Sequence, residues 1–335
     1  MSAPVPVRPS KPMLTARSSA ILAQKAGRAV EFLLARGTLP VLYWLKRDVL
    51  GVPAERELKN LEKYAERVRL VETQAPDGGW RLKKGASLGP DSAAGRLEVT
   101  VRNGFRLYDF GCEPEDEPLS RTVAFILARQ NREGAFLEPS GRVLPWGGQA
   151  LTLTLLCRLG LDASPKVQRG FRRMVKAQRA DGGWPAPPSH GPRPEGGERR
   201  RKTAASSPSV TGLVLGALAE SPRWRRSREA LRAADWLLDQ FFRATRPNGT
   251  GEVFRWAEIA YPFWTASLLS CVDSLATMGF RPEDRRLRLG LEWLMRHQHP
   301  AGPWEARRGK ASVDDHLWVT LSVLRVLRRF GLIAP

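Results

Sequence analysis

Two adjacent acidic residues near the C-terminus, Asp314 and Asp315, have the chemistry of a general acid. When neighbouring carboxylates are both ionised they repel each other, so the pKa of one rises and a protonated acid becomes possible. A helix N-terminus works in the opposite direction, because its dipole stabilises an anion. Ser312 stands three residues before Asp315, which is the spacing of a capping box ahead of an apolar helix. Two interpretations stay open: a helix cap alone, or a cap that also holds an acid at Asp314.

Carboxylates from distant helices can also act as a pair in sugar hydrolysis. The candidates for such a pair are Asp109, Glu258 and Asp314. The sequence contains no G-x-S-x-G elbow, Walker A loop, G-x-G-x-x-G fingerprint or D-D-x-x-D motif. We therefore expect acid chemistry without a cofactor or a metal ion.

Large aromatic side chains stand at or near the starts of the apolar segments. Their faces can stabilise a passing carbocation by cation–π attraction, but large rings also simply fill the end of a helical barrel. Both interpretations stay open. Together with Glu258, these rings form the predicted substrate-binding set: Trp146, Trp256, Tyr261, Phe263, Trp264 and Trp318.

The elements that would position these residues are organised by a repeat. A glutamine recurs at intervals of roughly 50–60 residues and is followed, after a glycine-containing turn, by an aromatic residue. A fifth unit, after Gln240, has a longer turn before Phe254. The four regular pairs are Gln74 with Trp80, Gln130 with Phe136, Gln178 with Trp184, and Gln298 with Trp304.

Each of these pairs, here called a glutamine–aromatic clasp, has a physical use at the end of a helix. A glycine in the left-handed conformation closes the last helical turn. The aromatic ring can then fold back over the helix it has left, and the glutamine amide can bond backbone groups of a neighbouring helix. We expect the clasps to join adjacent helices and to serve stability first.

The segments between the clasps read as helices of two kinds. Segments before each glutamine are amphipathic, and the segments that follow are apolar nearly all round, which is typical of buried helices. The amphipathic set is 55–73, 119–129, 164–177, 225–239 and 283–297, and the apolar set is 144–160, 207–219, 261–279 and 312–327. Alternation of the two kinds predicts an all-α fold: an α/α toroid of about six helix pairs, with apolar helices inside and basic ones outside.

The predicted domain organisation is a disordered basic arm over 1–27 and one toroid domain over 28–333. Two regions interrupt the helical pattern. Residues 95–118 read as a strand pair or irregular loop where an inner helix belongs. Residues 185–208 form a low-complexity loop.

The formal net charge of +20 attracts polyanions. The basic residues come in bursts at helical spacing, so we interpret most of them as solvated outer faces, with peripheral contact to an anionic membrane as a further possibility. No DNA- or RNA-binding motif accompanies them, and we predict no nucleic-acid partner. The three cysteines are far apart and form no C-x-x-C pair, which suggests a reducing cytoplasm. The longest apolar run, 261–280, is expected to be a buried helix.

The strings "QAPDGGW", "QRADGGW" and "QHPAGPW" resemble the QW motifs of squalene-hopene cyclases and of the related protein prenyltransferase β subunits. The resemblance covers roughly residues 30–333. It implies an α/α toroid with a hydrophobic central cavity for an isoprenoid chain. The motif is specific for the fold and weaker for activity, because function depends on the site.

The cyclases of this family protonate their substrate with an Asp-x-Asp-Asp motif. The most similar string here is Ser312-Val313-Asp314-Asp315, in which serine replaces the first aspartate. The resemblance implies that Asp314 is the proton donor, with Asp315 and His316 tuning or orienting it. The prenyltransferases hold zinc with Asp, Cys and His; the corresponding positions are Glu258, Ala260 and His316, so the set is one ligand short.

The expected ligand is an apolar isoprenoid or a lipid. The function expected from these observations is protonation-initiated cyclisation of a polyprenyl substrate. The alternatives are a non-catalytic lipid-binding or scaffolding toroid, and a carbohydrate-active α/α barrel. An inward-pointing Asp314 in a deep apolar cavity would favour the first, a packed core the second, and an open carboxylate-lined cleft the third.

Overall fold

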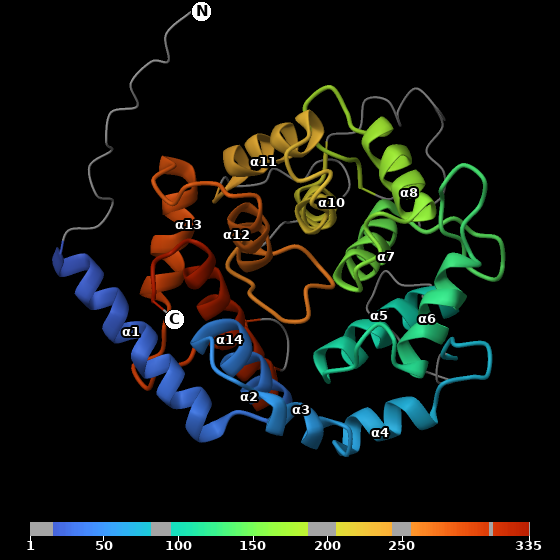
Figure 1. The fold of residues 1–335 in the computed structure, drawn as a ribbon. Helices are drawn as coiled ribbons and strands as arrows, with labels where there is room; N and C mark the ends of the chain where they lie inside the picture. Colours follow the sequence, from blue (N-terminus) through green and yellow to red (C-terminus); the bar gives the residue numbers. More distant parts are fainter. Residues whose placement is uncertain (1–15, 82–94, 187–205, 243–255, 308–310, 335) are drawn as a thin grey trace, which may run out of the picture.

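The structure, a computed structural model, describes residues 16–81, 95–186, 206–242, 256–307 and 311–334. Within these ranges the regular elements are helices, arranged as two concentric layers in a ring (Figure 1). The inner helices are α2 (Leu39–Leu45), α5 (Arg96–Asp109), α7 (Trp146–Arg158), α10 (Pro208–Glu220), α12 (Leu268–Thr277) and α14 (Val313–Arg329). The outer ones are α1 (Ala16–Arg36), α3 (Glu55–Leu61), α4 (Ala65–Glu72), α6 (Glu117–Leu127), α8 (Pro165–Lys176), α11 (Arg228–Gln240) and α13 (Arg285–Arg296). The predicted all-α toroid is confirmed.

The two layers follow from the apolar pattern of each helix. In α10 the residues buried in the core lie on every side of the helix, so it is enclosed by neighbours. In α8 the buried residues form one stripe that includes Phe171 and Met174, and the opposite face carries exposed Arg172 and Lys176. The outer helices therefore hold their apolar stripes against the inner ring and place their arginines in water.

The clasp between Gln178 and Trp184 shows how neighbouring hairpins are joined. The Gln178 amide donates to the carbonyl oxygens of Gly182 (2.9 Å) and of Glu229 in the next outer helix, α11 (2.8 Å). The Trp184 indole is fully buried and donates to the carbonyl oxygen of Met174 at the end of α8 (3.0 Å). Gly182 has φ of 97°, and a Cβ there would lie 2.8 Å from the Arg232 carbonyl oxygen, so only glycine fits. The same clasp supplies hydrogen bonds to backbone groups at a helix end and holds the next helix in place.

The last clasp closes the ring. Gln298 donates to the carbonyl oxygen of Lys25 in α1 (2.8 Å), and the Lys25 ammonium donates back to the carbonyl oxygen of Met295 (3.0 Å). Trp304 donates to the carbonyl oxygen of Leu294 (2.7 Å), as Trp184 does in its own unit. The final outer helix is thereby tied to the first. Of the longer fifth unit, Gln240 ends α11 and Phe254 lies outside the described residues.

The prediction that 95–118 is a strand pair or irregular loop is wrong, because residues 96–109 form the inner helix α5. Leu97, Val101 and Phe105 recur every four residues and are buried, which is a helical period that the local string "LEVTV" obscures. The helix also lacks a local cap. Its first amides, those of Leu97 and Glu98, donate to the carboxylate of Glu138 (2.8 and 3.2 Å), about forty residues away. A start signal that comes from a distant loop cannot be found in the local sequence.

Two other boundaries differ from expectation. The predicted arm over 1–27 is wrong for residues 16–27, which belong to α1; Leu22, Ala26 and Leu33 bury its inner stripe. Residues 1–15 lie outside the described residues, as does most of the 185–208 loop. The buried helix expected over 261–280 begins only at Leu268, because residues 258–267 form an irregular segment with a cis peptide bond between Tyr261 and Pro262.

Candidate functional site

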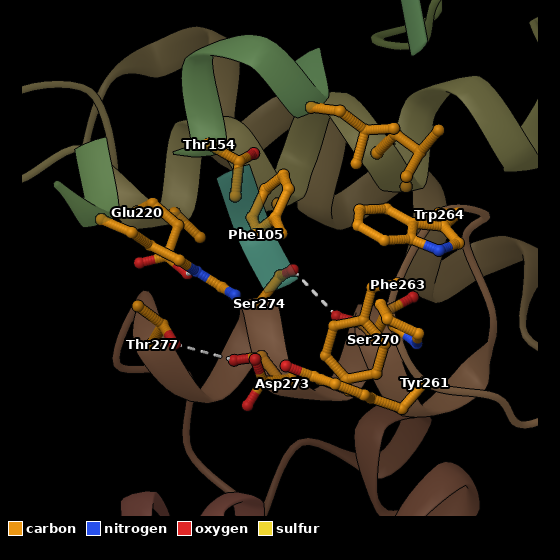
Figure 2. Close-up of a pocket in the computed structure, with 17 residues that line it drawn as sticks. Phe105, Thr154, Glu220, Tyr261, Phe263, Trp264, Ser270, Asp273, Ser274 and Thr277 are labelled. Atoms are coloured by element: carbon orange, nitrogen blue, oxygen red, sulfur yellow. Dashed lines mark hydrogen bonds and ion pairs between the residues drawn. The ribbon is translucent and has the colours of Figure 1, made fainter. Parts of the chain in front are cut away.

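The site is a small cavity inside the ring, lined toward the C-terminal ends of the inner helices. Its volume is about 50 Å³. Glu220 and Thr277 lie on one side of it and Trp264 on the other (Figure 2). One side is therefore charged and polar, and the other is aromatic. The lining comes from α5 (Phe105), α7 (Leu151, Thr154, Arg158), α10 (Gly212, Leu213, Gly216, Ala219, Glu220), α12 (Ser270, Asp273, Ser274, Thr277) and residues 261–264.

The irregular segment before α12, residues 258–267, crosses the middle of the ring (orange in Figure 1). The Trp264 ring meets Phe105 of α5 edge-on, with centroids 5.3 Å apart. The Tyr261 ring stacks on Trp318 of α14, with centroids 4.9 Å apart and an interplanar angle of 9°. These side chains reach two other inner helices, α5 and α14, so the segment fills part of the centre of the ring.

Asp109, the last residue of α5, is the buried carboxyl at the centre. It is 6% exposed, and its Oδ1 accepts a hydrogen bond from the Tyr261 hydroxyl (2.6 Å). Burial raises the pKa of Asp109 to about 6, and the Tyr261 hydrogen bond and the positive charges of Arg158 and Arg325 hold it from rising further. Burial also raises the pKa of Tyr261 well above its usual value, so the phenol remains a proton donor. The carboxyl thus exchanges a proton near neutral pH.

A second carboxyl, Glu220, lines the cavity, whereas Asp109 reaches the lining only through Tyr261, and the pKa of Glu220 is shifted in the opposite direction. Burial raises the pKa of Glu220, but the Arg158 guanidinium, 2.8 Å away, more than offsets it and the net pKa is below the usual range. Glu220 is therefore an anion held by a cation. Carboxyls whose pKa values are pushed apart in this way are suited to different roles, one as an acid and the other as a fixed charge.

Further ion pairs surround the C-terminal ends of the inner helices. Arg325 pairs with Asp48 (2.7 Å) and stacks over the Trp44 ring, and Arg329 pairs with Asp273. The Trp44 indole donates to the backbone carbonyl oxygen of Asp109 (2.8 Å). These contacts connect the end of α5 to α2 and α14 and fix the position of the Asp109 backbone.

The predicted acid cluster lies elsewhere, at the start of α14. Asp315 accepts from the Ser312 amide (2.7 Å), and the Ser312 hydroxyl accepts from the Asp315 amide (3.2 Å), so the two form a capping box. Asp314 is exposed and accepts from the Thr38 hydroxyl (3.2 Å). Partial burial raises the pKa of Asp314, against the Thr38 hydrogen bond and with help from nearby Glu66. His316 Nδ1 accepts from the Ala306 amide (2.8 Å). None of these three side chains lines the cavity.

The predicted substrate-binding residues divide between the cavity and the outer layer. Tyr261, Phe263 and Trp264 line the cavity, and Trp318 stacks behind Tyr261. Trp146 instead lies beneath Arg173 of α8, with 4.6 Å from the guanidinium carbon to the ring centre. Trp256 packs on Phe241 next to α11, with centroids 4.8 Å apart. Glu258 is half-buried at the start of the irregular segment and is not part of the lining.

The sequence indicated Asp109 only as one of three possible carboxylates for sugar hydrolysis. It did not single out Arg158 or Glu220. A helical reading of 96–109 would have placed Asp109 four residues after Phe105, on the buried stripe. Arg158 and Glu220 are each the final residue of an apolar inner helix, and a charge in that place is a usable signal. Within the described ranges, no three His, Cys, Asp or Glu side chains are grouped so as to hold a metal ion. No described helix has the length and hydropathy needed to cross a membrane.

Comparisons with known proteins bear on the fold. No protein-family model matches the chain, and no curated protein sequence matches it significantly. A variant of the type II terpene cyclase MstE from Scytonema, in complex with its product merosterolic acid A, superposes with a TM-score of 0.50 at 15% identity, covering 96% of this chain and 100% of that one. A glycosidase superposes with a TM-score of 0.50 at 12% identity, with the same coverage. At such identities the similarity establishes the fold alone: the chain is an α/α toroid of the kind found in terpene cyclases and glycosidases.

Proposed function

We propose that the protein cyclises an isoprenoid by protonating it, and that the acid is Asp109 at the ring centre rather than Asp314. The observation that carries this proposal is a buried carboxyl with a raised pKa that is hydrogen-bonded to Tyr261, one of the aromatic residues lining the cavity. With a pKa of about 6, about one Asp109 carboxyl in ten is protonated at pH 7. An apolar ligand that excludes water would raise this fraction further.

The chemistry needs only a proton and a shaped apolar surface. Asp109 gives its proton to a carbon–carbon double bond, ring closure moves the positive charge along the chain, and loss of a proton from another carbon ends the reaction as an isomerisation. The rings of Phe105 and Trp318, which Trp264 and Tyr261 contact in this structure, supply faces that stabilise a cation. This proposal assigns the ligand to the isoprenoid class and gives Asp314, Asp315 and His316 a positional role at the start of α14.

Two alternatives each have an observation in their favour. The small cavity favours a non-catalytic lipid-binding or scaffolding toroid. The glycosidase with the same fold, together with the cavity carboxylates Glu220 and Asp273, favours a carbohydrate-active α/α barrel. Cytoplasmic localisation and peripheral contact with an anionic membrane stay predictions; the exposed basic face of α8 is the described surface that suits such contact.

The deciding experiment compares two matched variants, Asp109→Asn and Asp314→Asn. Each protein is incubated with polyprenols, polyprenyl diphosphates, squalene and a panel of oligosaccharides, and products are identified by mass spectrometry. Asp109→Asn keeps an acceptor for the Tyr261 hydroxyl and loses the proton donor, so turnover of the isoprenoid should fall by about 10²–10⁴-fold. Asp314→Asn should remain within a few-fold of the wild type.

The outcomes separate the three functions. If Asp314→Asn lost turnover and Asp109→Asn retained it, the acid would be Asp314, at the start of α14. Binding of polyprenols without any product favours the lipid-binding toroid, and release of reducing sugar favours the carbohydrate-active barrel. Melting temperature and near-UV circular dichroism of both variants establish that any loss of turnover is not a loss of folding.

A further inference from the structure

We propose that residues 258–267 are a plug that occupies the ligand site in this structure and leaves the ring centre when a ligand enters. This inference rests on the proposed isoprenoid function. The first step is the size of the cavity. Its volume of about 50 Å³ holds a few water molecules, whereas small-molecule sites in proteins typically measure about 300–1,000 Å³. An isoprenoid chain therefore needs space that is now filled by protein.

The second step is the identity of the filling. Outside residues 261–264, every residue that lines the cavity belongs to an inner helix, whose backbone is fixed by its own hydrogen bonds and by its clasps. Tyr261, Phe263 and Trp264 come from the irregular segment and lie around the cavity in Figure 2. Removal of residues 258–266 would enlarge the central space and leave Ser267, the N-cap of α12, in place.

The third step is how few backbone–backbone hydrogen bonds hold the segment, although Glu258 and Thr265 have further interactions. Among the described residues, one backbone–backbone hydrogen bond joins residues 258–266 to another part of the chain, from the Arg307 amide to the Ile259 carbonyl oxygen (2.8 Å). The other, from the Trp264 amide to the Pro262 carbonyl oxygen, is internal to the segment. Segments held by few backbone bonds open at much lower free energy than the helices around them.

The fourth step is that the side-chain contacts of the plug are ones that a ligand can replace. Tyr261 donates to Asp109 and covers the face of Trp318, and Trp264 meets Phe105. A polyprenol can replace these contacts, since one of its double bonds can lie beside Asp109 in place of the Tyr261 hydroxyl and its apolar chain can cover the two rings. While the plug is in place, the phenol holds the Asp109 carboxyl, so the acid meets a substrate only after the segment has moved.

The fifth step is a built-in fit between the plug and α10. Gly212 of α10 has no side chain where the segment passes, and a Cβ there would lie 2.5 Å from the Cβ of Ala266 and 3.1 Å from the Sγ of Cys271 in α12. Gly216, one turn further along the same helix, is a matched control, because a Cβ there would meet only the Ser274 hydroxyl oxygen at 3.6 Å. Alanine is a better helix former than glycine, so neither substitution weakens α10 itself.

The experiment measures hydrogen–deuterium exchange of peptides covering 258–267 in the wild type, Gly212→Ala and Gly216→Ala, with and without farnesol. We expect farnesol to accelerate exchange of the segment in the wild type at least tenfold. Gly212→Ala should accelerate it without ligand and bind farnesol several-fold more tightly, as followed by tryptophan fluorescence. Without ligand, Gly216→Ala should show wild-type exchange in the segment, because its added methyl group meets Ser274 and not the plug. Tyr261→Phe, which removes only the hydroxyl, should give a smaller increase and serves if Gly212→Ala does not fold.

The results separate the plug from the proposed function. Farnesol binding without faster exchange in 258–267 overturns the plug and leaves the cyclase proposal standing. Farnesol-driven exchange without turnover of any isoprenoid overturns the cyclase proposal and supports the plug. Absence of binding in every variant, including Gly212→Ala, overturns both.

Discussion

Asp314 and Asp109 are both carboxylates at the ends of inner helices, and they differ in almost every physical respect. Asp314 lies in the first turn of α14, is exposed, and neighbours the capping box of Ser312 and Asp315. Asp109 ends α5, is buried, and is bonded by a phenol. A helix N-terminus stabilises an anion and a C-terminus destabilises it, so the dipoles favour ionisation at Asp314 and protonation at Asp109. The acidic motif marks a helix start here, while the deeply buried carboxyl, that of Asp109, belongs to no motif.

The largest expected effect comes from Trp318, the residue that connects the two regions. It lies one turn after Asp314, is 6% exposed, and stacks on Tyr261. Trp318→Ala should lower the free energy of unfolding by about 3–5 kcal/mol, because it leaves a cavity against the Tyr261 ring. Urea denaturation measures this value. Val313→Ala, at a residue 73% exposed in the same helix, is the control and should change stability by less than about 0.5 kcal/mol.

The next effect is a pH dependence at Asp109. Its pKa is about 6 in the folded protein and 3.8 as a free side chain, so the stability it contributes is complete below about pH 4 and is lost as pH rises through 6. Asp109→Asn removes this loss. From pH 4 to pH 8 the variant should gain about 3 kcal/mol of unfolding free energy relative to the wild type. If the difference in unfolding free energy between the two proteins stayed constant across this range, the pKa of Asp109 would not be raised by folding.

A smaller effect is expected at the start of α14. Ser312→Ala removes the hydroxyl that accepts from the Asp315 amide and should cost about 1 kcal/mol of stability. Urea titrations at pH 7 measure the loss. If Ser312→Ala were neutral while Asp315→Ala removed isoprenoid turnover, the capping role would be secondary. Asp314 and Asp315 would then again be candidates for the acid.

The smallest effect is expected for Asp314→Asn. The pKa of Asp314 is raised, so its charge opposes folding slightly, and stability is lost in the same direction as for Asp109 as pH rises. Because the side chain is exposed, the change at pH 7 should stay within about 0.5 kcal/mol. A large stabilisation of this variant, comparable to that of Asp109→Asn, would show that Asp314 and Asp109 have similar environments.

The parts of the fold that were predictable are those with local signals. Gln178, Gly182 and Trp184 lie within seven residues of one another and mark one helix end. The repetition of this pattern indicated the ring. Helix α5 was not predictable in the same way, because its cap, Glu138, comes from a different loop. For the same reason the burial of Asp109 was hidden, since it depends on where α5 runs.

The position of residues 258–267 was also beyond the local sequence. Tyr261, Phe263 and Trp264 have the apolar character of an inner helix, and the prediction extended the helix over them. Their actual place depends on contacts with Phe105, Trp318 and Asp109, which lie on helices α5 and α14. The residue types indicated an aromatic centre, and only the assembled ring shows that a loop supplies it.

The clasp from Gln298 to Lys25 joins residues 273 positions apart, and this has a consequence during protein synthesis. Helix α1 leaves the ribosome early, yet the partner that ties it down, α13, follows some 250 residues later. At a translation rate of about 5–20 residues per second, roughly 12–50 s pass between the synthesis of α1 and that of α13. The ring therefore cannot close until the last outer helix has been synthesised.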